Sequence, residues 1–266
     1  MRSWAVGFTF LFFLSSCEKL VKYNANEIDL EEKYRNLNTK NLDRLRSTTP
    51  KNSFSFIVIS DSQRSYDELN DFVKKANSNG EISFVVLNGD ITDFGLQTEY
   101  LWITQRMQKL SFPFIVVIGN HDMMGNGREI YRQMFGAENF SFSYSGYRFI
   151  ILNSNSREAK LNERLPDTAW LKRELSSTSS QEKIFVLAHI PPMGGDFDRV
   201  IEPVYSRMLT ENGRVVYSIH GHEGIFYLWQ PYGPPVNYLG INSLNKRTYV
   251  LINVTSDAIK VEQLFF

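Results

Sequence analysis

The chain has 266 residues, of which 42% are hydrophobic and 14% aromatic, and its 29 Lys and Arg side chains balance 29 Asp and Glu side chains. This is enough apolar material to bury the core of one large globular domain. The formal net charge of +0 argues against binding nucleic acid or an anionic membrane through bulk charge, because phosphate neutralisation needs an excess of Lys and Arg on one face.

The amino terminus predicts export. Arg2 precedes an apolar run at residues 5–14 that is too short to span a bilayer but suits the core of a signal peptide. Small residues then lead into Cys17, and this order is similar to the bacterial lipoprotein signal, whose cysteine is lipidated after cleavage. We predict a signal peptide at 1–16 and a lipid anchor on Cys17, which would hold the protein to a bacterial membrane, periplasmic or at the cell surface. The alternative is a buried thiol behind an ordinary secretory signal, and with one cysteine no internal disulfide can form.

Residues 17–51 are polar and charged, which predicts a tether before the main domain. Leu30, Tyr34, Leu37 and Leu42 fall near one face of a possible helix within this segment. A helix docked on the domain and a disordered linker are both compatible with so few large apolar side chains. The main domain is expected at residues 52–266.

The main domain begins with strands and helices in alternation. Apolar strands are expected at 54–60, 82–87 and 115–118, with amphipathic helices at 65–79 and 97–110. This β-α-β-α-β order implies parallel neighbours joined by right-handed crossovers. The elements expected next are a helix near 129–135, a hairpin at 140–153, a helix at 167–176, a strand at 184–188, a helix ending near 212 and a strand at 215–219. From residue 225 the pattern is typical of antiparallel strands, with a loop at 230–238.

Polar side chains gather where five of these strands end. The carboxyl ends of parallel strands share one edge of a sheet, which is where open α/β sheets place their ligands. Oxygen and imidazole donors together suit a divalent ion such as Mn, Fe or Zn. One such cluster is more simply explained as turn chemistry, but five together favour a metal centre. The residues are Asp61, Gln63, Asp90, Asp93, Asn120, His121, Asp122, His189, His220 and His222, which include all four histidines of the chain.

The order Asp-x-Gln, Gly-Asp, Gly-Asn-His-Asp, a strand-borne His and Gly-His resembles the calcineurin-like metallophosphoesterase family over residues 54–266. The resemblance implies an α/β fold, a four-layer α/β/β/α sandwich of two mixed β-sheets flanked by helices, with two divalent ions. In that family pattern Asp90 would bridge both ions, Asp61 and Gln63 would belong to the first site, and the second site would be completed by Asn120, His189 and His222. His121 would act on the substrate with Asp122 orienting it, and a metal-bound hydroxide would attack phosphorus in line.

The sequence departs from the family pattern at two positions. Gln63 stands where a His is usual, and Gly224 stands where the last motif has its second His. Both changes remove imidazole from the first site, and the remaining oxygen donors favour Mn or Mg over Zn. Glu223 could replace the lost ligand or face away. We expect a metal-dependent phosphoesterase acting on a phosphomonoester or phosphodiester; the alternative is a non-catalytic or single-metal binding lipoprotein that retains the fold.

Several neighbouring residues keep two interpretations. Asp93 is either a carboxylate that orients a ligand from behind or the cap of the following helix. His220 either supports a ligand in the same way or is simply buried and hydrogen-bonded. Arg64 and Arg128 could clamp a phosphate, although a solvated surface charge is the default for a single Arg and is favoured here. The sequence indicates no protein partner and no oligomeric state.

Overall fold

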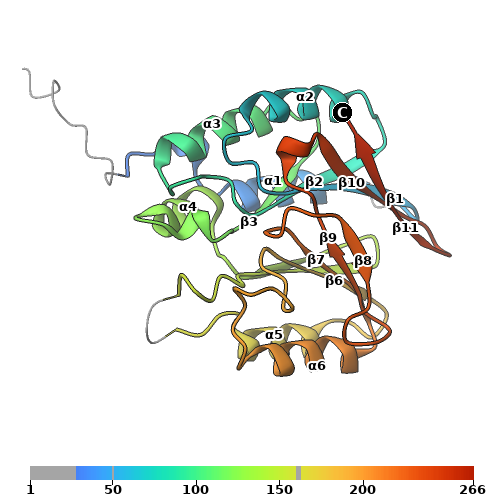
Figure 1. The fold of residues 1–266 in the computed structure, drawn as a ribbon. Coiled ribbons are helices and arrows are strands. Elements are labelled where there is room, and N and C mark those ends of the chain that lie inside the picture. The colour runs from blue at the N-terminus through green and yellow to red at the C-terminus, as the bar shows by residue number, and fades with distance from the viewer. Residues whose placement is uncertain (1–27, 50, 160–162) are drawn as a thin grey trace, which may run out of the picture.

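The computed structural model describes residues 28–49, 51–159 and 163–266. The predicted signal peptide and Cys17 lie outside these ranges. Two β-sheets pack face to face with helices on their outer faces (Figure 1). This arrangement confirms the predicted four-layer α/β sandwich. Within the described ranges, none of the helices has the length and hydropathy needed to cross a membrane.

The first sheet has the strand order β11-β10-β1-β2-β3. Its parallel part consists of β1 (Phe54–Ile59), β2 (Ile82–Asn88) and β3 (Phe114–Val117). The crossovers run through α2 (Tyr66–Asn77) and α3 (Gln97–Met107), as the alternating pattern predicts. Two antiparallel strands, β10 (Thr248–Val254) and β11 (Ile259–Phe265), extend the sheet beyond β1.

The second sheet has the order β4-β5-β6-β7-β9-β8. Its strands are β4 (Phe140–Tyr144), β5 (Tyr147–Leu152), β6 (Lys183–Ala188), β7 (Val215–His220), β8 (Tyr227–Trp229) and β9 (Asn237–Gly240). The hairpin of β4 and β5 lies where the sequence predicts it. The prediction of antiparallel strands from residue 225 is confirmed for the pair of β8 and β9 and the pair of β10 and β11, but β9 also pairs with β7, and that pairing is parallel. A short buried strand carries no direction in its periodicity, and its pairing is set by where the preceding loop returns the chain.

Aromatic side chains fill the space between the two sheets. Phe56 stacks on Phe84 at 5.1 Å between ring centroids, and Phe149 stacks on Phe185 at the same distance. Phe56 meets Phe149 edge to face across the sandwich at 5.4 Å. Such offset and edge contacts add to the free energy of burying these large rings. These ring contacts therefore fix the two sheets relative to each other.

Helices cover the outer faces of both sheets. The outer face of the first sheet packs against α2, α3 and α4 (Gly127–Phe135). The outer face of the second sheet packs against α5 (Thr168–Ser177) and α6 (Glu202–Asn212), which lie side by side below it in Figure 1. Both outer layers are apolar on the side that faces the sheet, in keeping with the amphipathic patterns of the helices.

The predicted tether contributes a short 3₁₀ turn, η1 (Glu32–Tyr34), and the helix α1 (Leu37–Arg46). The Asn38 side chain donates to the carbonyl of Val116 at 2.9 Å and accepts from its amide at 2.8 Å. Asn41 accepts from the amide of Phe114 at 3.2 Å. Because β3 is an edge strand, its backbone groups would otherwise lack partners on this side. This part of the segment is therefore packed on the domain.

Candidate metal centre

The strand ends of the two sheets are joined at Asn88, the last residue of β2. Its amide nitrogen donates to the carbonyls of Ala188 at 3.3 Å and Ile219 at 3.4 Å, in the second sheet. Its own carbonyl accepts from the Ser60 hydroxyl at 2.9 Å. Sequence reasoning missed this residue, although a buried Asn that ends an apolar strand was a visible signal. The joint brings the predicted ligands of both sheets to one place.

His189 is held in a single tautomer by the same carbonyl. Its Nδ1 lies 2.8 Å from the Asn88 oxygen, which can only accept, so Nδ1 carries the hydrogen. Nε2 is buried, has no hydrogen-bond partner and lies 3.2 Å from Asp90 Oδ2. Burial disfavours both charges, but the attraction between them raises the pKa of His189 to about 10 and lowers that of Asp90. A cation that binds here must displace the proton on Nε2.

His222 approaches the same place from the end of β7. Its Nε2 lies 3.0 Å from Asp196 Oδ2, and its Nδ1 lies 3.0 Å from Asn120 Oδ1. Both partners are oxygen acceptors, so the ring N–H can donate to either one; the tautomer that donates to the Asp196 carboxylate leaves the Nδ1 lone pair facing the Asn120 oxygen. Two acceptors at this distance suit a shared cation. Asp196, in the Gly-rich loop after β6, was also missed by sequence reasoning, because nothing in that loop indicates which side chain turns inward.

The donor atoms of Asp90, His189 and His222 all lie within 4.8 Å of one another. We call these three residues, with Asn120, the imidazole half of the centre. Two nitrogen and two oxygen donors fit a divalent transition-metal ion.

The other half offers oxygen only and consists of Asp61 and Gln63 beside the shared Asp90; we call it the oxygen half. Gln63 Oε1 is buried without a hydrogen-bond partner, and Asp61 Oδ2 accepts from the backbone amide of His222 at 3.3 Å. Burial raises the pKa of Asp61; His189 opposes this effect, and the charge of Asp90 adds to it. The Gln63 side chain reaches Asp90, with Nε2 3.5 Å from Oδ2. Carboxylate and amide oxygens suit a hard cation, which would also relieve the repulsion between the two carboxylates.

The backbone at the centre is strained. Asp61, Asp90 and His222 have φ values of 53°, 53° and 64°, in the left-handed region. An L-residue in this region costs about 1–2 kcal/mol, and such residues cluster at functional sites. Gly119 serves the same approach, because a Cβ there would lie 2.1 Å from the amide nitrogen of Asp90. The Gly-Asn motif therefore lets β3 close on the Asp90 loop.

His121 and Asp122 separate in the structure, at the 3₁₀ turn η2 (His121–Met123). His121 Nδ1 lies 2.8 Å from the carbonyl of Asp93, and its backbone amide donates to Asp90 Oδ1 at 3.1 Å. The buried Asp122 carboxylate instead accepts from the amides of Gly119 at 2.8 Å and Thr92 at 2.9 Å. The expectation that Asp122 orients His121 is therefore wrong: Asp93 orients the imidazole, and Asp122 ties two loops together.

Two of the open roles are also settled. Asp93 does not cap α3, whose N-cap is Leu96; its carboxylate binds Arg64, and Oδ1 lies 3.9 Å from His121 Nδ1. His220 is wholly buried, with Nε2 2.8 Å from the Ser218 hydroxyl and its ring stacked on Tyr238. Burial lowers the pKa of His220 to about 3. This is the buried, hydrogen-bonded alternative, on the helix-facing side of the second sheet.

The two arginines differ completely. Arg128 is bound to Glu138 at 2.6 and 2.8 Å and to Glu163 at 2.6 and 2.7 Å, and its side chain is 12% exposed. It is engaged in a bidentate pair with each glutamate and is not placed to clamp a phosphate. Arg64 bonds to Asp93 and is 72% exposed.

The last motif departs from the family pattern because of its local packing. Gly224 has φ +60°, and a Cβ there would lie 2.5 Å from the Ser243 hydroxyl. Its carbonyl also accepts a hydrogen bond from Lys246, in the 3₁₀ turn η3 (Leu244–Lys246). The Glu223 carboxylate is directed toward Gly194 rather than toward Asp61 or Gln63, since Oε1 lies 2.9 Å from the Cβ position of that glycine.

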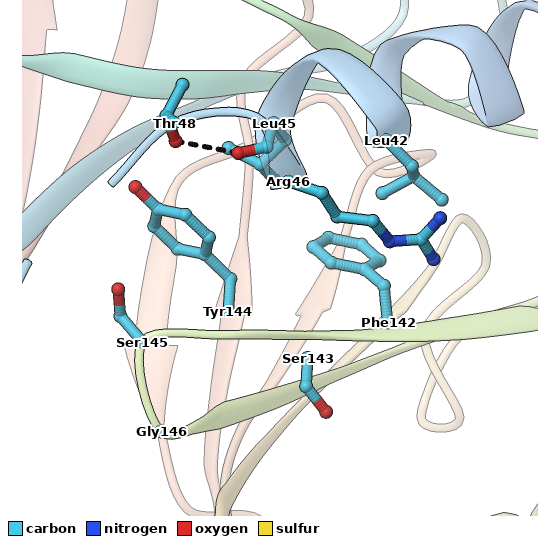
Figure 2. Close-up of a pocket in the computed structure, with 9 residues that line it drawn as sticks. All are labelled: Leu42, Leu45, Arg46, Thr48, Phe142, Ser143, Tyr144, Ser145 and Gly146. Carbon is cyan, nitrogen blue, oxygen red and sulfur yellow. Dashed lines mark hydrogen bonds between the residues drawn. The ribbon is translucent and has the colours of Figure 1, made fainter. Parts of the chain in front are cut away.

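A hollow of about 220 Å³ lies between α1 and the β4–β5 hairpin (Figure 2). Leu42, Arg46, Phe142 and Tyr144 are among the residues that line it. None of its lining residues is a predicted ligand, so this hollow is separate from the candidate metal centre.

Comparisons with known proteins agree with this geometry. A family model described as calcineurin-like phosphoesterase matches residues 54–226. Purple acid phosphatase PPD1 from yellow lupin (Lupinus luteus) seeds superposes with a TM-score of 0.65 at 12% identity, over 80% of this chain and 51% of that one. The chain thus spans about half the length of the lupin enzyme.

Two further solved structures align with most of this chain, and the alignment also covers most of their own length. The GAP50 anchor of the inner membrane complex of Plasmodium has a TM-score of 0.63 at 13% identity, over 81% of this chain and 85% of that one. The protein TT1561 of Thermus thermophilus has a TM-score of 0.53 at 13% identity, over 79% and 98%. At such low identity these likenesses show a shared fold. No curated protein matches the sequence.

Proposed function

The chain belongs to the calcineurin-like phosphoesterase family, and on that premise we propose that it hydrolyses a phosphomonoester or phosphodiester with the help of divalent metal ions, Mn being favoured at the oxygen half. One observation carries the proposal. The donor atoms of Asp90, His189 and His222 converge within 4.8 Å, next to His121. A scaffold without catalysis has no chemical need for this imidazole at the mouth of a metal centre.

Divalent ions bound at the centre would polarise the phosphoryl oxygens and lower the pKa of a bound water. Asp90 lies between both donor sets, since Oδ2 is 3.2 Å from His189 Nε2 and 3.5 Å from Gln63 Nε2. Asn120, His189 and His222 would complete one metal site, and Asp61 and Gln63 the other. A bound ion would also oppose the burial that raises the pKa of Asp61.

His121 is the group that would handle the proton of the leaving alkoxide. Nδ1–H is engaged by the Asp93 carbonyl, so Nε2 is the atom left for the substrate, and the side chain is 37% exposed. Burial works against the charged ring, but the Asp93 carbonyl and the nearby carboxylates raise its pKa. A protonated Nε2 can donate to the departing oxygen, or stabilise the charge on the phosphoryl oxygens.

Asp90→Asn and His121→Ala test this proposal, with Asp43→Asn as a control. Asp43 is an exposed carboxylate on α1, paired with Arg46. Turnover of an aryl phosphomonoester and an aryl phosphodiester is measured with added Mn. We expect losses of about a hundredfold or more in the two site variants and none in the control. Site variants as fast as the parent would refute the assignment of this site.

A second candidate function is a single-metal or non-catalytic binding protein that retains the fold. Two observations favour it: the oxygen half has no imidazole, and the GAP50 anchor shares this fold. Gln63→His discriminates between the candidates. A large gain in turnover with added Mn indicates a degraded first site, and a gain in metal affinity without a gain in turnover indicates a native variant site.

Membrane attachment is a separate part of the proposal. We propose that the protein is exported and anchored through lipid on Cys17, on the basis of the signal-like segment before it. The parent should then partition with membranes and take up labelled fatty acid in a bacterial host, and Cys17→Ala should lose both properties. An unlabelled parent in the water-soluble fraction would contradict the anchor.

A further inference from the structure

Arg64 has a backbone conformation that its side chain does not favour. Its φ is 63°, in the left-handed region shared by three predicted ligands, Asp61, Asp90 and His222. Gly or Asn would adopt this turn at lower cost. A strained residue persists where the structure around it depends on its side chain, and such residues gather at functional sites. Arg64 is the residue of this strained group that metal ligation does not explain.

The Arg64 side chain is anchored on the residue that orients His121. Nε donates to Asp93 Oδ2 at 2.7 Å, and Nη2 donates to the same oxygen. The carbonyl of Asp93 contacts His121 Nδ1 at 2.8 Å. Both arginine bonds use one edge of the guanidinium, and in the described part of the chain no hydrogen bond engages Nη1. Asp93 therefore contacts both the guanidinium and the imidazole that we assign to the substrate, whose Nδ1 lies 3.9 Å from Asp93 Oδ1.

Phe94 holds the guanidinium from another side. The guanidinium carbon lies 6.0 Å from the centre of the Phe94 ring, within the range of a cation–π contact. The Arg64 side chain is 72% exposed and Phe94 is 54% exposed, so neither contact closes the group off. An exposed arginine usually loses side-chain entropy when it binds an anion, and these two contacts reduce that loss.

The arginines near the predicted ligands have acidic partners: Arg157 binds Asp196, Arg128 binds two glutamates and Arg64 binds Asp93. Arg64 differs in that its partner also contacts His121, the imidazole that we assign to the substrate. Guanidinium groups bind phosphate oxygens with paired N–H donors.

We propose that Arg64 binds the non-bridging phosphate oxygens of the substrate, with Asp93 and Phe94 fixing its guanidinium. The inference rests on the proposed function for the identity of the substrate. It goes further by assigning a substrate-binding residue at a position that no part of the metal pattern requires. It also means that Asp93 has two contacts to serve, one to His121 through its carbonyl and one to Arg64 through its carboxylate.

Arg64→Gln tests this inference, with Arg247→Gln as a matched control. Arg247 has φ 55°, binds Asp71 at 2.9 Å and lies 5.2 Å from the ring of Phe266, but it contacts no predicted ligand. Inorganic phosphate is titrated into the Mn-loaded chain by calorimetry, and KM is measured for an aryl phosphate. We expect Arg64→Gln to weaken phosphate binding and raise KM about tenfold, as for loss of a hydrogen bond to a charged group. Arg64→Lys should recover part of this, and the control should match the parent.

Arg64→Asn separates binding from a structural role. Asn adopts the left-handed region readily, so the thermal midpoint should stay level or rise while phosphate binding weakens. A lower midpoint together with unchanged phosphate affinity would assign Arg64 to the fold and overturn the inference.

The outcomes also separate this inference from the proposed function. Normal turnover by the parent with equal phosphate affinity in Arg64→Gln would overturn only the role of Arg64. A parent without turnover whose phosphate binding depends on Arg64 would support the role and refute hydrolysis. A parent that binds no phosphate and hydrolyses neither an aryl phosphomonoester nor a phosphodiester would overturn both.

Discussion

The two halves of the metal centre differ in how firmly neighbouring residues hold their predicted ligands. In the imidazole half, His189 and His222 each have one ring nitrogen held by an acceptor, the Asn88 carbonyl at 2.8 Å and the Asp196 carboxylate at 3.0 Å. In the oxygen half, Gln63 contributes an oxygen that no other group holds. Outer contacts that fix a ligand commonly change metal affinity by about 10–100-fold. We therefore expect metal affinity to depend on the residues that hydrogen-bond to each ligand as well as on the ligand itself.

Among the proposed variants, His189→Ala should have the largest effect on metal binding and turnover. The change removes a buried ligand and leaves Asp90 without its partner, so we expect the loss of tight metal binding and a fall in turnover of about a hundredfold or more. Gln63→Ala is the matched change in the oxygen half, and there a loss of about tenfold in affinity for the weaker ion is expected. Metal content after dialysis measures both. Equal losses in the two variants would show that the halves do not differ.

Asp196 tests the effect of an outer contact alone, because it contacts His222 without being a predicted ligand. Asp196→Ala should weaken metal binding at the imidazole half by about tenfold, with little change at the oxygen half. Asp196→Asn keeps an oxygen acceptor for Nε2–H and should retain most of the affinity. Titration of the metal-free chain with Mn, followed by electron paramagnetic resonance, reads out the free ion. A full loss in the Asn variant would assign the effect to charge rather than to the tautomer.

Adding an imidazole to the oxygen half should reduce the difference in metal affinity between the two halves. Gln63→His restores the usual family ligand where the side-chain oxygen is already buried, so affinity for Zn should rise by about tenfold. Gly224→His is the poorer choice, since its Cβ would meet Ser243 Oγ at 2.5 Å with φ +60°. We expect that variant to lower the thermal midpoint by several degrees without a comparable gain in metal content. Calorimetric Zn titration and a thermal scan of both variants provide the test.

The smallest expected effect concerns a residue outside the metal centre, Glu138, and is a change in the pH dependence of folding stability. Burial opposes the charge of Glu138, but Arg128, Asn153 and Arg132 lower its pKa below the ordinary value of 4.5. A lowered pKa in the folded chain contributes stability above pH 4.5 that is lost as pH falls through the folded pKa. Glu138→Gln should therefore be less stable than the parent at neutral pH, with a gap that closes below pH 4.5. A constant gap in urea unfolding would contradict this sign.

Much of the fold could be predicted from the sequence because the parallel strands β1, β2 and β3 are mostly apolar and the crossover helices between them each bury one apolar face. The direction of β9 could not, since Tyr238 and Leu239 are buried whichever way the strand runs. The metal pattern was readable because Asp90, Asn120 and His189 follow strands directly.

The supporting residues were harder to find. Asp196 lies in a loop with no period, and Asn88 was read only as the residue before a Gly-Asp pair. Adjacency in sequence does not fix the direction of a side chain: in the turn η2, the His121 ring contacts the Asp93 carbonyl, and the Asp122 carboxylate accepts from backbone amides.

Stepwise metal loading tests whether two metal sites of unequal affinity together support hydrolysis. Mn is added to the metal-free chain while bound metal and turnover of an aryl phosphodiester are followed in the same sample. The account predicts one tight equivalent at the imidazole half, a second and weaker equivalent at the oxygen half, and turnover that rises with the second. A chain that binds one equivalent or none and turns over neither an aryl phosphodiester nor a monoester with Mn, Fe, Mg or Zn would contradict it.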